Sequence, residues 1–225
     1  MCATARWASP PDCRGEPRDG AVAWRAGGDA DWFAFRLELD RPPEDLPAAF
    51  ARWDAEGHPA PVGRRSVCWE VDVDVPGVDV PERYAPVTLL GMVRTGRPPS
   101  VRPTIARAPP DEAADAARAL GPAYDLRWLL RGLAAGGGTI LAAREGGRIV
   151  GAVAVCRRPG EARLRELWVA PAQRGRGLGA ALLDAAVAHA GDRRVVVAAE
   201  DAAVGLYERA GFRAVSRFVV ASTPR

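Results

Sequence analysis

Apolar and polar residues alternate in several short segments of the first hundred residues, which is the pattern of half-buried β-strands. Four strands are expected, over residues 21–27, 31–40, 65–75 and 84–93. The third alternates most strictly, with an apolar face made of Val67, Trp69, Val71, Val73 and Val75. Its other face is expected to be wet and acidic and carries Cys68, Glu70, Asp72 and Asp74. Residues 43–57 are expected to form a helix, since a proline and acidic residues open the segment and Gly57 follows it.

The rest of the chain alternates strands and helices more regularly. Strands are expected over residues 104–108, 139–145, 148–158, 162–170, 193–200 and 212–222. Helices are expected over residues 111–120, 123–138 and 201–211, and from a glycine-rich turn to about His189. This order combines hairpins with one strand–helix–strand crossover, so the sheet must contain both parallel and antiparallel pairs. The predicted fold class is therefore α/β (α+β) with a mixed sheet.

A segment rich in proline and glycine, residues 94–103, interrupts these patterns and is expected to be a linker. It divides the chain into an N-terminal α/β domain of residues 21–103 and a C-terminal domain of residues 104–225. Residues 1–20, rich in Pro, Gly, Arg and Asp, are expected to form a mobile tail. No convincing repeat is visible in the sequence.

The composition is that of an ordinary globular protein, with 48% hydrophobic and 26% charged residues. The net charge of +3 is too small to favour a nucleic acid or a membrane as partner. Residues 1–103 carry a net charge of −3 and residues 104–225 a net charge of +6, so the second half suits an anionic ligand. All 31 cationic side chains are arginines, and the chain has neither Lys nor Asn. A motif that usually contains Asn or Lys is therefore filled differently here.

The four cysteines and two histidines of the chain show no metal-ligand spacing. No Cys-x-x-Cys motif and no histidine pair occurs, so we expect neither a metal site nor a disulfide framework. The first residues lack the apolar core of a signal peptide, and no apolar run reaches membrane-spanning length. A cytoplasmic location is therefore expected.

Residues 170–183 read APAQRGRGLGAALL and place three glycines and two arginines at the start of an Ala/Leu-rich helix. The segment Gly175–Ala180 matches the dinucleotide-binding pattern GxGxxG/A, with Glu200 near the place of a ribose-binding acid. Five residues separate Val169 from Gly175, however, and only 25 residues follow Glu200. That is too short to complete a dinucleotide fold, so an oxidoreductase of this type is the weaker alternative.

The same residues can bind a different anion. Glycine lets successive backbone N–H groups point toward a ligand without a Cβ in the way, and the helix adds unpaired N–H groups and the positive end of its dipole. Arg174 and Arg176 add positive charge, so the turn suits a pyrophosphate. A tight turn packed on a helix would also use three glycines. Two arginines in one turn would repel each other without an anion, which favours the ligand.

Two motifs in this half resemble those of the GCN5-related N-acetyltransferases (GNAT family). Residues LWVAPAQRGRGLGAALLDAA are similar to the family's acetyl-CoA signature, in which R/Q-x-x-G-x-G/A opens a helix; Arg174, Gly177 and Gly179 occupy the motif positions. Residues AAVGLYERAGF are similar to its second block, a helix ending in Y-x-x-x-G-F. The resemblance covers residues 104–222. It departs from the family where an Asn often precedes the tyrosine by seven residues, because Glu200 stands there.

The resemblance implies a fold, a cosubstrate and a set of site residues. Acetyl-CoA would enter a gap between two splayed parallel strands, and its pantetheine arm would pair with the first of them. The implied coenzyme-binding residues are Leu167, Trp168, Val169, Arg174, Gly175, Arg176, Gly177, Leu178, Gly179 and Ala180. Tyr207 would protonate the departing thiolate, and the base for the amine would be Glu166, Glu200 or solvent.

The expected activity is transfer of an acetyl group from acetyl-CoA to a primary amine, with a small molecule preferred over a protein. The acceptor is left open among a small amine, an antibiotic, an amino acid and a protein N-terminus, and the chain is expected to be a monomer or homodimer. A non-catalytic acetyl-CoA-binding regulatory module is the main alternative. Three roles stay open for the N-terminal region: a degenerate acyltransferase-like half, a lid over the amine pocket, or a segment that mediates dimerisation.

Overall fold

The computed structural model describes residues 14–25, 35–55, 65–75, 80–81, 84–95, 105–118, 130, 134 and 137–222. The chain forms two compact units that do not follow the order of the sequence. Unit 1 comprises Met1–Gly91, Ala198–Asp201 and Ala214–Arg225, and unit 2 comprises Met92–Val197 and Ala202–Arg213. The boundary predicted between residues 103 and 104 lies outside the described residues and stays a prediction.

Unit 1 is built on a mixed sheet. Its elements are β1 (Arg14–Arg18), β2 (Ala21–Arg25), β3 (Phe35–Leu39), α1 (Leu46–Ala55), β4 (Arg65–Asp72), most of β5 (Ala85–Arg94) and most of β11 (Arg213–Ser222). The strands follow the order β1-β2-β3-β4-β11-β5. The pairs β1–β2 and β2–β3 are antiparallel, and β3–β4 is parallel with α1 as the crossover. The last strand of the chain, β11, runs antiparallel to β4 over seven residue pairs.

The expectation of one wet, acidic face on β4 is wrong at Cys68, whereas Glu70 is half-buried and Asp72 and Asp74 are exposed as expected. Val67 and Trp69 lie in a core that α1 also contributes to. Cys68, expected on the wet face, is fully buried and packs with Phe218 and Val220 of β11. The alternation detected one apolar face, but the apolar neighbours of Cys68 on the other face come from the adjacent strand β11, more than 140 residues later in the sequence.

The N-terminal tail also needs correction. Arg14–Arg18 were expected to be mobile, but they form β1 and pair with all five residues of β2. A short segment of mixed polar residues does not predict a strand by itself. An edge strand pairs with a neighbour on one side only, so its sequence need not be apolar. Residues 1–13 lie outside the described residues.

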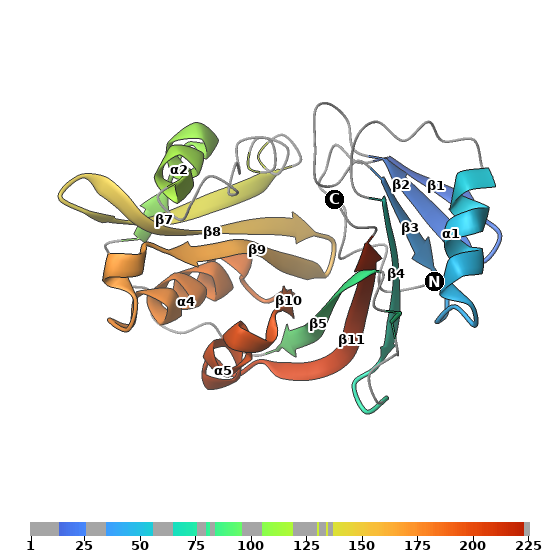
Figure 1. Cartoon of the computed structure of the whole chain (residues 1–225). Helices are drawn as coiled ribbons and strands as arrows, with labels where there is room; N and C mark the ends of the chain where they lie inside the picture. The colour runs from blue at the N-terminus through green and yellow to red at the C-terminus, as the bar shows by residue number, and fades with distance from the viewer. Residues whose placement is uncertain are drawn as a thin grey trace. The chain divides into compact units, whose positions relative to one another are not determined.

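The strands of unit 2 are also a mixture of parallel and antiparallel neighbours, and helices lie on both of their faces (Figure 1). Its elements are β6 (Ile105–Arg107), α2 (Pro110–Ala117), β7 (Gly138–Glu145), β8 (Arg148–Arg158), β9 (Glu161–Val169), the short 3₁₀ helix η3 (Pro171–Gln173), α4 (Leu178–Ala190), β10 (Arg194–Ala199) and α5 (Asp201–Arg209). The strand order is β10-β9-β8-β7-β6. Only β9–β10 is parallel, and α4 is its crossover.

Successive residues of β8 point to opposite faces of the sheet and pack against different helices. Ala152 packs in a cluster with the buried alanines of α2, together with Ile140 and Trp168. A Cβ on the neighbouring Gly151 would lie 3.0 Å from the Leu182 side chain of α4. Glycine at this position therefore allows α4 to approach the sheet closely.

The predicted mixed sheet, the hairpin of β7 and β8, and the helix after the glycine-rich turn are confirmed. The helix predicted over residues 123–138 lies mostly outside the described residues. Among the helices described, none is long and apolar enough to cross a membrane.

Candidate functional site

The parallel strands β9 and β10 of unit 2 pair only near their beginnings. The ladder joins Arg194, Val195 and Val196 of β10 to Glu161, Ala162 and Arg163 of β9. β9 then continues through six further residues to Val169, beyond the last paired position. The last residues of β9, Leu167 to Val169, lie beyond this ladder, and an extended ligand can pair with such backbone as an added strand would.

A β-bulge marks the same part of β9. Ala152 of β8 pairs with Trp168 and Ala154 pairs with Arg165, so β9 has one residue more than β8 between these pairs. Glu166 lies in this bulge with a φ of 49°, and it is the single non-glycine with positive φ among the described residues. Bulges bend a strand and re-aim its side chains, and a left-handed non-glycine residue often marks a functional site.

The turn predicted to bind an anion, residues 174–180, follows β9 after the short helix η3 and is called the cradle below. Gly175 and Gly177 have φ angles of 75° and 77°, in the region that favours glycine. A Cβ built on either residue meets no atom within 4 Å, so the space above their amides is open. Gly177 is the N-cap of α4 and has no side-chain cap, and the first helical bond runs from the Ala181 amide to the Gly177 carbonyl. The amides of Leu178, Gly179 and Ala180 therefore receive no partner from the helix and remain available to an anion.

The two arginines of the cradle are held differently. Arg174 donates from Nε to the Val169 carbonyl at 3.2 Å, so its side chain folds back along the end of β9. Arg176 contacts the Gln173 side chain and lies 3.8 Å from the Glu145 carboxylate at the end of β7. Arg176 therefore does not require an anion, contrary to expectation, because the protein itself supplies the Glu145 carboxylate. Both arginines are exposed and can also reach a ligand.

A buried ion network fixes the paired end of β9 and β10. Glu161 accepts a hydrogen bond from Arg163 Nε at 2.7 Å and one from Arg194 Nη2 at 2.9 Å. Burial raises the pKa of Glu161, but the hydrogen bonds and charges of the two arginines outweigh burial and hold it below the ordinary value. The network joins the two strands just before they separate. Sequence reasoning missed it, because Arg194 reaches Glu161 only through the parallel pairing.

The second motif is a helix C-cap that positions an aromatic pair. At the end of α5 the Phe212 amide donates to the Tyr207 carbonyl at 3.0 Å, the Gly211 amide donates to the Glu208 carbonyl at 2.9 Å, and Gly211 has a φ of 83°. This is a Schellman motif, which brings residues five positions apart into contact. The rings of Tyr207 and Phe212 meet edge to face with centroids 5.6 Å apart. Tyr207 is 5% exposed, so its ring is fixed within unit 2.

The remaining predicted residues occupy distinct places. Trp168 is buried among residues that pack on α2, whereas Leu167 and Val169 are half-buried on the unpaired part of β9. A Cβ on Gly179 would lie in ordinary van der Waals contact with Leu206 of α5 and with Val169. Glu200 is exposed between β10 and α5 and belongs to unit 1. Unit 2 thus contains every predicted site residue except Glu200.

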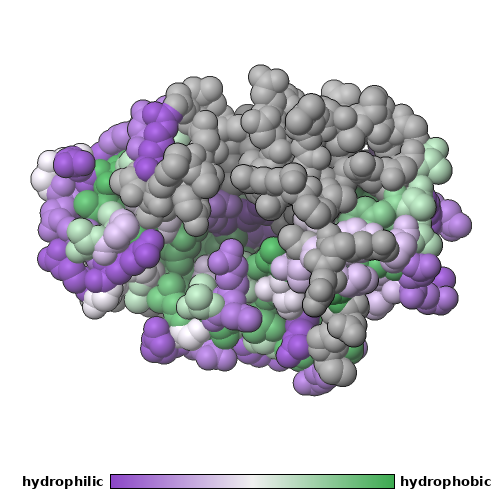
Figure 2. Space-filling view, in the orientation of Figure 1, coloured by the Kyte–Doolittle hydropathy of each residue, from purple (hydrophilic) through white to green (hydrophobic). Residues whose placement is uncertain are grey.

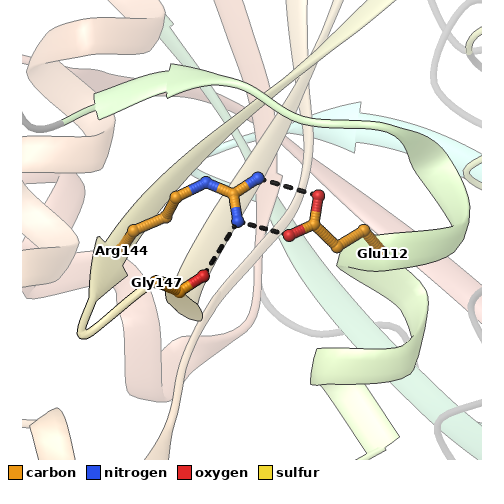
Figure 3. A network of polar contacts seen from close by, with 3 residues as sticks. All are labelled: Glu112, Arg144 and Gly147. Carbon is orange, nitrogen blue, oxygen red and sulfur yellow. Dashed lines mark hydrogen bonds and ion pairs between the residues drawn. The ribbon is translucent and has the colours of Figure 1, made fainter.

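Charged residues surround the β7–β8 turn next to the cradle. Arg144 binds both carboxylate oxygens of Glu112 in the first turn of α2, and its Nη1 donates to the Gly147 carbonyl at 3.2 Å (Figure 3). The hydrogen bond from Arg144 holds the pKa of Glu112 below its ordinary value. Hydrophilic side chains dominate the surface over α2 and this turn (Figure 2). Sequence reasoning also missed Glu145 and Gln173, which connect the turn to the cradle through Arg176.

Comparison with known proteins agrees with this geometry. Residues 110–222 match the family model of the acetyltransferase (GNAT) domain. The fold is similar to a GCN5-related N-acetyltransferase from Kribbella flavida, with 20% identity, a TM-score of 0.64, and coverage of 100% of this chain and 97% of the other. It is also similar to a functionally unknown conserved protein from Staphylococcus epidermidis, with 13% identity, a TM-score of 0.69, and coverage of 100% and 98%.

A third similar structure is a tandem GNAT protein from the clavulanic acid biosynthesis pathway. It has 16% identity and a TM-score of 0.59, and the match covers 96% of this chain and 84% of the other. No curated protein matches the chain.

Proposed function

Because this chain belongs to the GNAT family of acetyltransferases, we propose that it transfers the acetyl group of acetyl-CoA to a primary amine of a small molecule. The observation that carries the proposal is the open turn at the start of α4, which presents backbone amides beside the unpaired end of β9. An anion and an extended chain can bind there side by side. Coenzyme A consists of such a combination, a pyrophosphate joined to a pantetheine arm.

The residues of unit 2 fit this cosubstrate. The amides of Gly175 to Ala180 would hold the pyrophosphate, with added charge from Arg174 and Arg176. The backbone of Leu167, Trp168 and Val169 would pair with the pantetheine amides along β9. The bound acetyl-CoA supplies an activated acetyl thioester. The protein supplies position and proton transfer for direct attack by an amine in a ternary complex.

Two proton transfers accompany this attack. The attacking amine must lose a proton, and we assign the base to Glu166 or Glu200, or to solvent. Glu166 is favoured by its place in the bulge of β9, where its backbone is held in an uncommon conformation. The leaving sulfur must gain a proton, which we assign to the Tyr207 hydroxyl. The edge-to-face contact with Phe212 supports this role, because it fixes the direction of the tyrosine ring.

A product assay with acetyl-CoA and a broad panel of amines tests the proposal. We expect acetylated product from at least one small amine, together with thermal stabilisation by acetyl-CoA and none by NAD(P)H. Binding of acetyl-CoA without any product would instead support the non-catalytic regulatory module. Stabilisation by NAD(P)H alone would favour the dinucleotide-binding alternative. Sedimentation with and without the coenzyme measures whether the enzyme acts as a monomer or a homodimer.

A further inference from the structure

The two units share one arrangement of strands and helix. In unit 1, β1, β2 and β3 are successive antiparallel neighbours, and α1 connects β3 to the parallel strand β4. In unit 2, β7, β8 and β9 are successive antiparallel neighbours, and α4 connects β9 to the parallel strand β10. The strand orders β1-β2-β3-β4 and β7-β8-β9-β10 therefore correspond strand by strand. Unit 1 therefore contains the same succession of three antiparallel strands, a helix and a parallel strand that carries the cradle in unit 2.

The two strand pairs differ at their far ends. β3 pairs with β4 from Phe35 to Glu38 and has a single residue, Leu39, beyond the ladder. β9 has six residues beyond its ladder with β10. β3 therefore offers a single residue beyond its ladder, which is too short for an extended ligand arm.

The connections from strand to helix have opposite charge. In unit 1 the six residues Asp40–Asp45 contain three carboxylates, one arginine, two prolines and no glycine. In unit 2 the eight residues Ala170–Gly177 contain two arginines, two glycines and no acidic residue. A cavity of about 440 Å³ beside the unit 1 connection adds Asp19 and Arg52 to its charged lining, which leaves it with a net negative charge. A polyanion would be repelled from this position.

The helix starts also differ in their free amides. The Ala48 amide, third in α1, donates to the Asp45 side chain at 3.2 Å, and Pro47 has no N–H group. Only Leu46 retains an unpaired amide among the first three residues of α1. In α4 the corresponding residues Leu178, Gly179 and Ala180 all keep theirs, because Gly177 provides no cap. The donors that would hold an anion are thus lost in unit 1 by a proline and a capping carboxylate.

We infer that unit 1 is a degenerate second copy of the acyl-CoA-binding topology, in which the coenzyme site has been closed, so that each chain binds one coenzyme molecule. The inference rests on the proposed function of unit 2. It selects one of the roles left open for the N-terminal region: a duplicated half that keeps the fold without the chemistry. The acidic connection and the carboxylate cap are the features that close the site.

Calorimetric titration of the full chain with coenzyme A tests the inference. We expect a stoichiometry of about one per chain, and no remaining binding in the Gly177→Val variant. Gly160→Val is the matched control, since Gly160 has a φ of 71°, equally open space around a Cβ, and a place in the β8–β9 turn away from the cradle. This control should bind one equivalent, and its circular dichroism shows whether such a change alone unfolds the protein.

Two equivalents per chain, or one equivalent remaining in Gly177→Val, would overturn the inference. No binding by the unchanged protein would overturn the proposed function, and with it the single coenzyme site. An Asp45→Asn variant gives a second measurement, because asparagine caps a helix about as well as aspartate without the charge. We expect its coenzyme affinity and stoichiometry to equal those of the unchanged chain, and a several-fold change in either would contradict a closed site in unit 1.

Discussion

Units 1 and 2 place a helix after a strand in the same topological position, but only the helix of unit 2 begins with an open turn. α4 starts from Gly177 with its first amides unpaired, whereas α1 starts from Asp45, whose side chain accepts the Ala48 amide. Topology aims the helix N-terminus at the same place in both units. The chemistry of a few residues then decides whether the N-terminus attracts an anion or is already satisfied. A shared fold is therefore not evidence for a shared site.

The largest expected effect is a loss of stability when residues 104–225 are separated from the N-terminal part of the chain. Residues 104–225 expressed alone should not fold cooperatively, because β11 would lose its seven-residue ladder with β4 and expose Phe218, Val219 and Val220. Circular dichroism melts of this fragment and the full chain provide the measurement. A sharp, cooperative melt of the fragment near the temperature of the full chain would show that residues 104–225 fold without β1 to β5.

The next largest effect is expected on coenzyme affinity, when the Gly177→Val substitution disturbs the open cradle of unit 2. Valine at position 177 would be strained at a φ of 77°, and relief of this strain would change the turn that presents the amides. Charge-assisted hydrogen bonds are each worth about 1.5–3 kcal/mol, so loss of two lowers coenzyme affinity by about 100-fold or more. Titration calorimetry measures the change. Affinity within a few-fold of the original would place the coenzyme elsewhere.

Tyr207→Phe separates binding from catalysis within unit 2. We expect kcat to fall by about 100-fold, the lower range for loss of a general acid, while the Kd for acetyl-CoA changes by less than about twofold. The ring and its contact with Phe212 are retained, so the fold should be unchanged. Steady-state kinetics with the best amine of the panel measures kcat, and direct titration of acetyl-CoA measures the Kd. An unchanged kcat would remove Tyr207 from the mechanism.

Glu161→Gln tests the network that joins β9 and β10 where they pair. Removing one partner of a buried ion pair costs about 3 kcal/mol, so we expect a loss of this size in the free energy of unfolding at pH 7. The pKa of Glu161 is lower in the folded protein than in the unfolded chain. Its stabilisation is therefore complete above the unfolded value near 4.5 and is lost as the pH falls through the folded value.

The variant and the unchanged protein should accordingly converge in stability at low pH. Urea unfolding at a series of pH values between about 3 and 7 measures this convergence. A difference that is the same at every pH would assign the loss to packing rather than to the charge of Glu161.

The smallest expected effect concerns His189 at the end of α4. Burial, followed by the charges of Arg157 and Arg107, lowers the pKa of His189 below 6.5. The unfolded chain therefore binds a proton that the folded protein does not, and stability should rise with pH from the folded pKa to about 6.5. His189→Gln should remove this rise and leave stability above pH 7 little changed. Thermal melts at pH 5 and pH 8 measure it, and an unaltered pH dependence in the variant would assign the rise to another group.

Local features of the fold could be predicted because the residues that cause them are neighbours in the sequence. The hairpin of β7 and β8 follows from two apolar strand-forming segments around a glycine pair, and α4 from an apolar pattern after a glycine turn. The cradle belongs to this class, since Gly175 and Gly177 adopt the conformation that their position requires. The Tyr207–Phe212 pair is local too, because one helix C-cap brings the two rings together.

Other features could not be predicted, because they depend on pairing between distant segments. The burial of Cys68 requires β11, which lies more than 140 residues away in the chain. The bulge at Glu166 exists only relative to β8, and the ion network of Glu161 only relative to β10. The repeat between the two units escaped detection in the sequence for a related reason: the units share strand order and direction, while the residues at their helix starts differ in charge and in glycine content.

The sequence by itself determined the elements, the mixed sheet and a glycine turn at the start of α4, since each is set by residues within a few positions of one another. The tertiary structure decided which strands separate, which unit receives the last strand and which of two equivalent helix starts stays open. Those properties arise from hydrogen bonds and packing between segments far apart in the chain, and a reading along the sequence contains no direct measure of them.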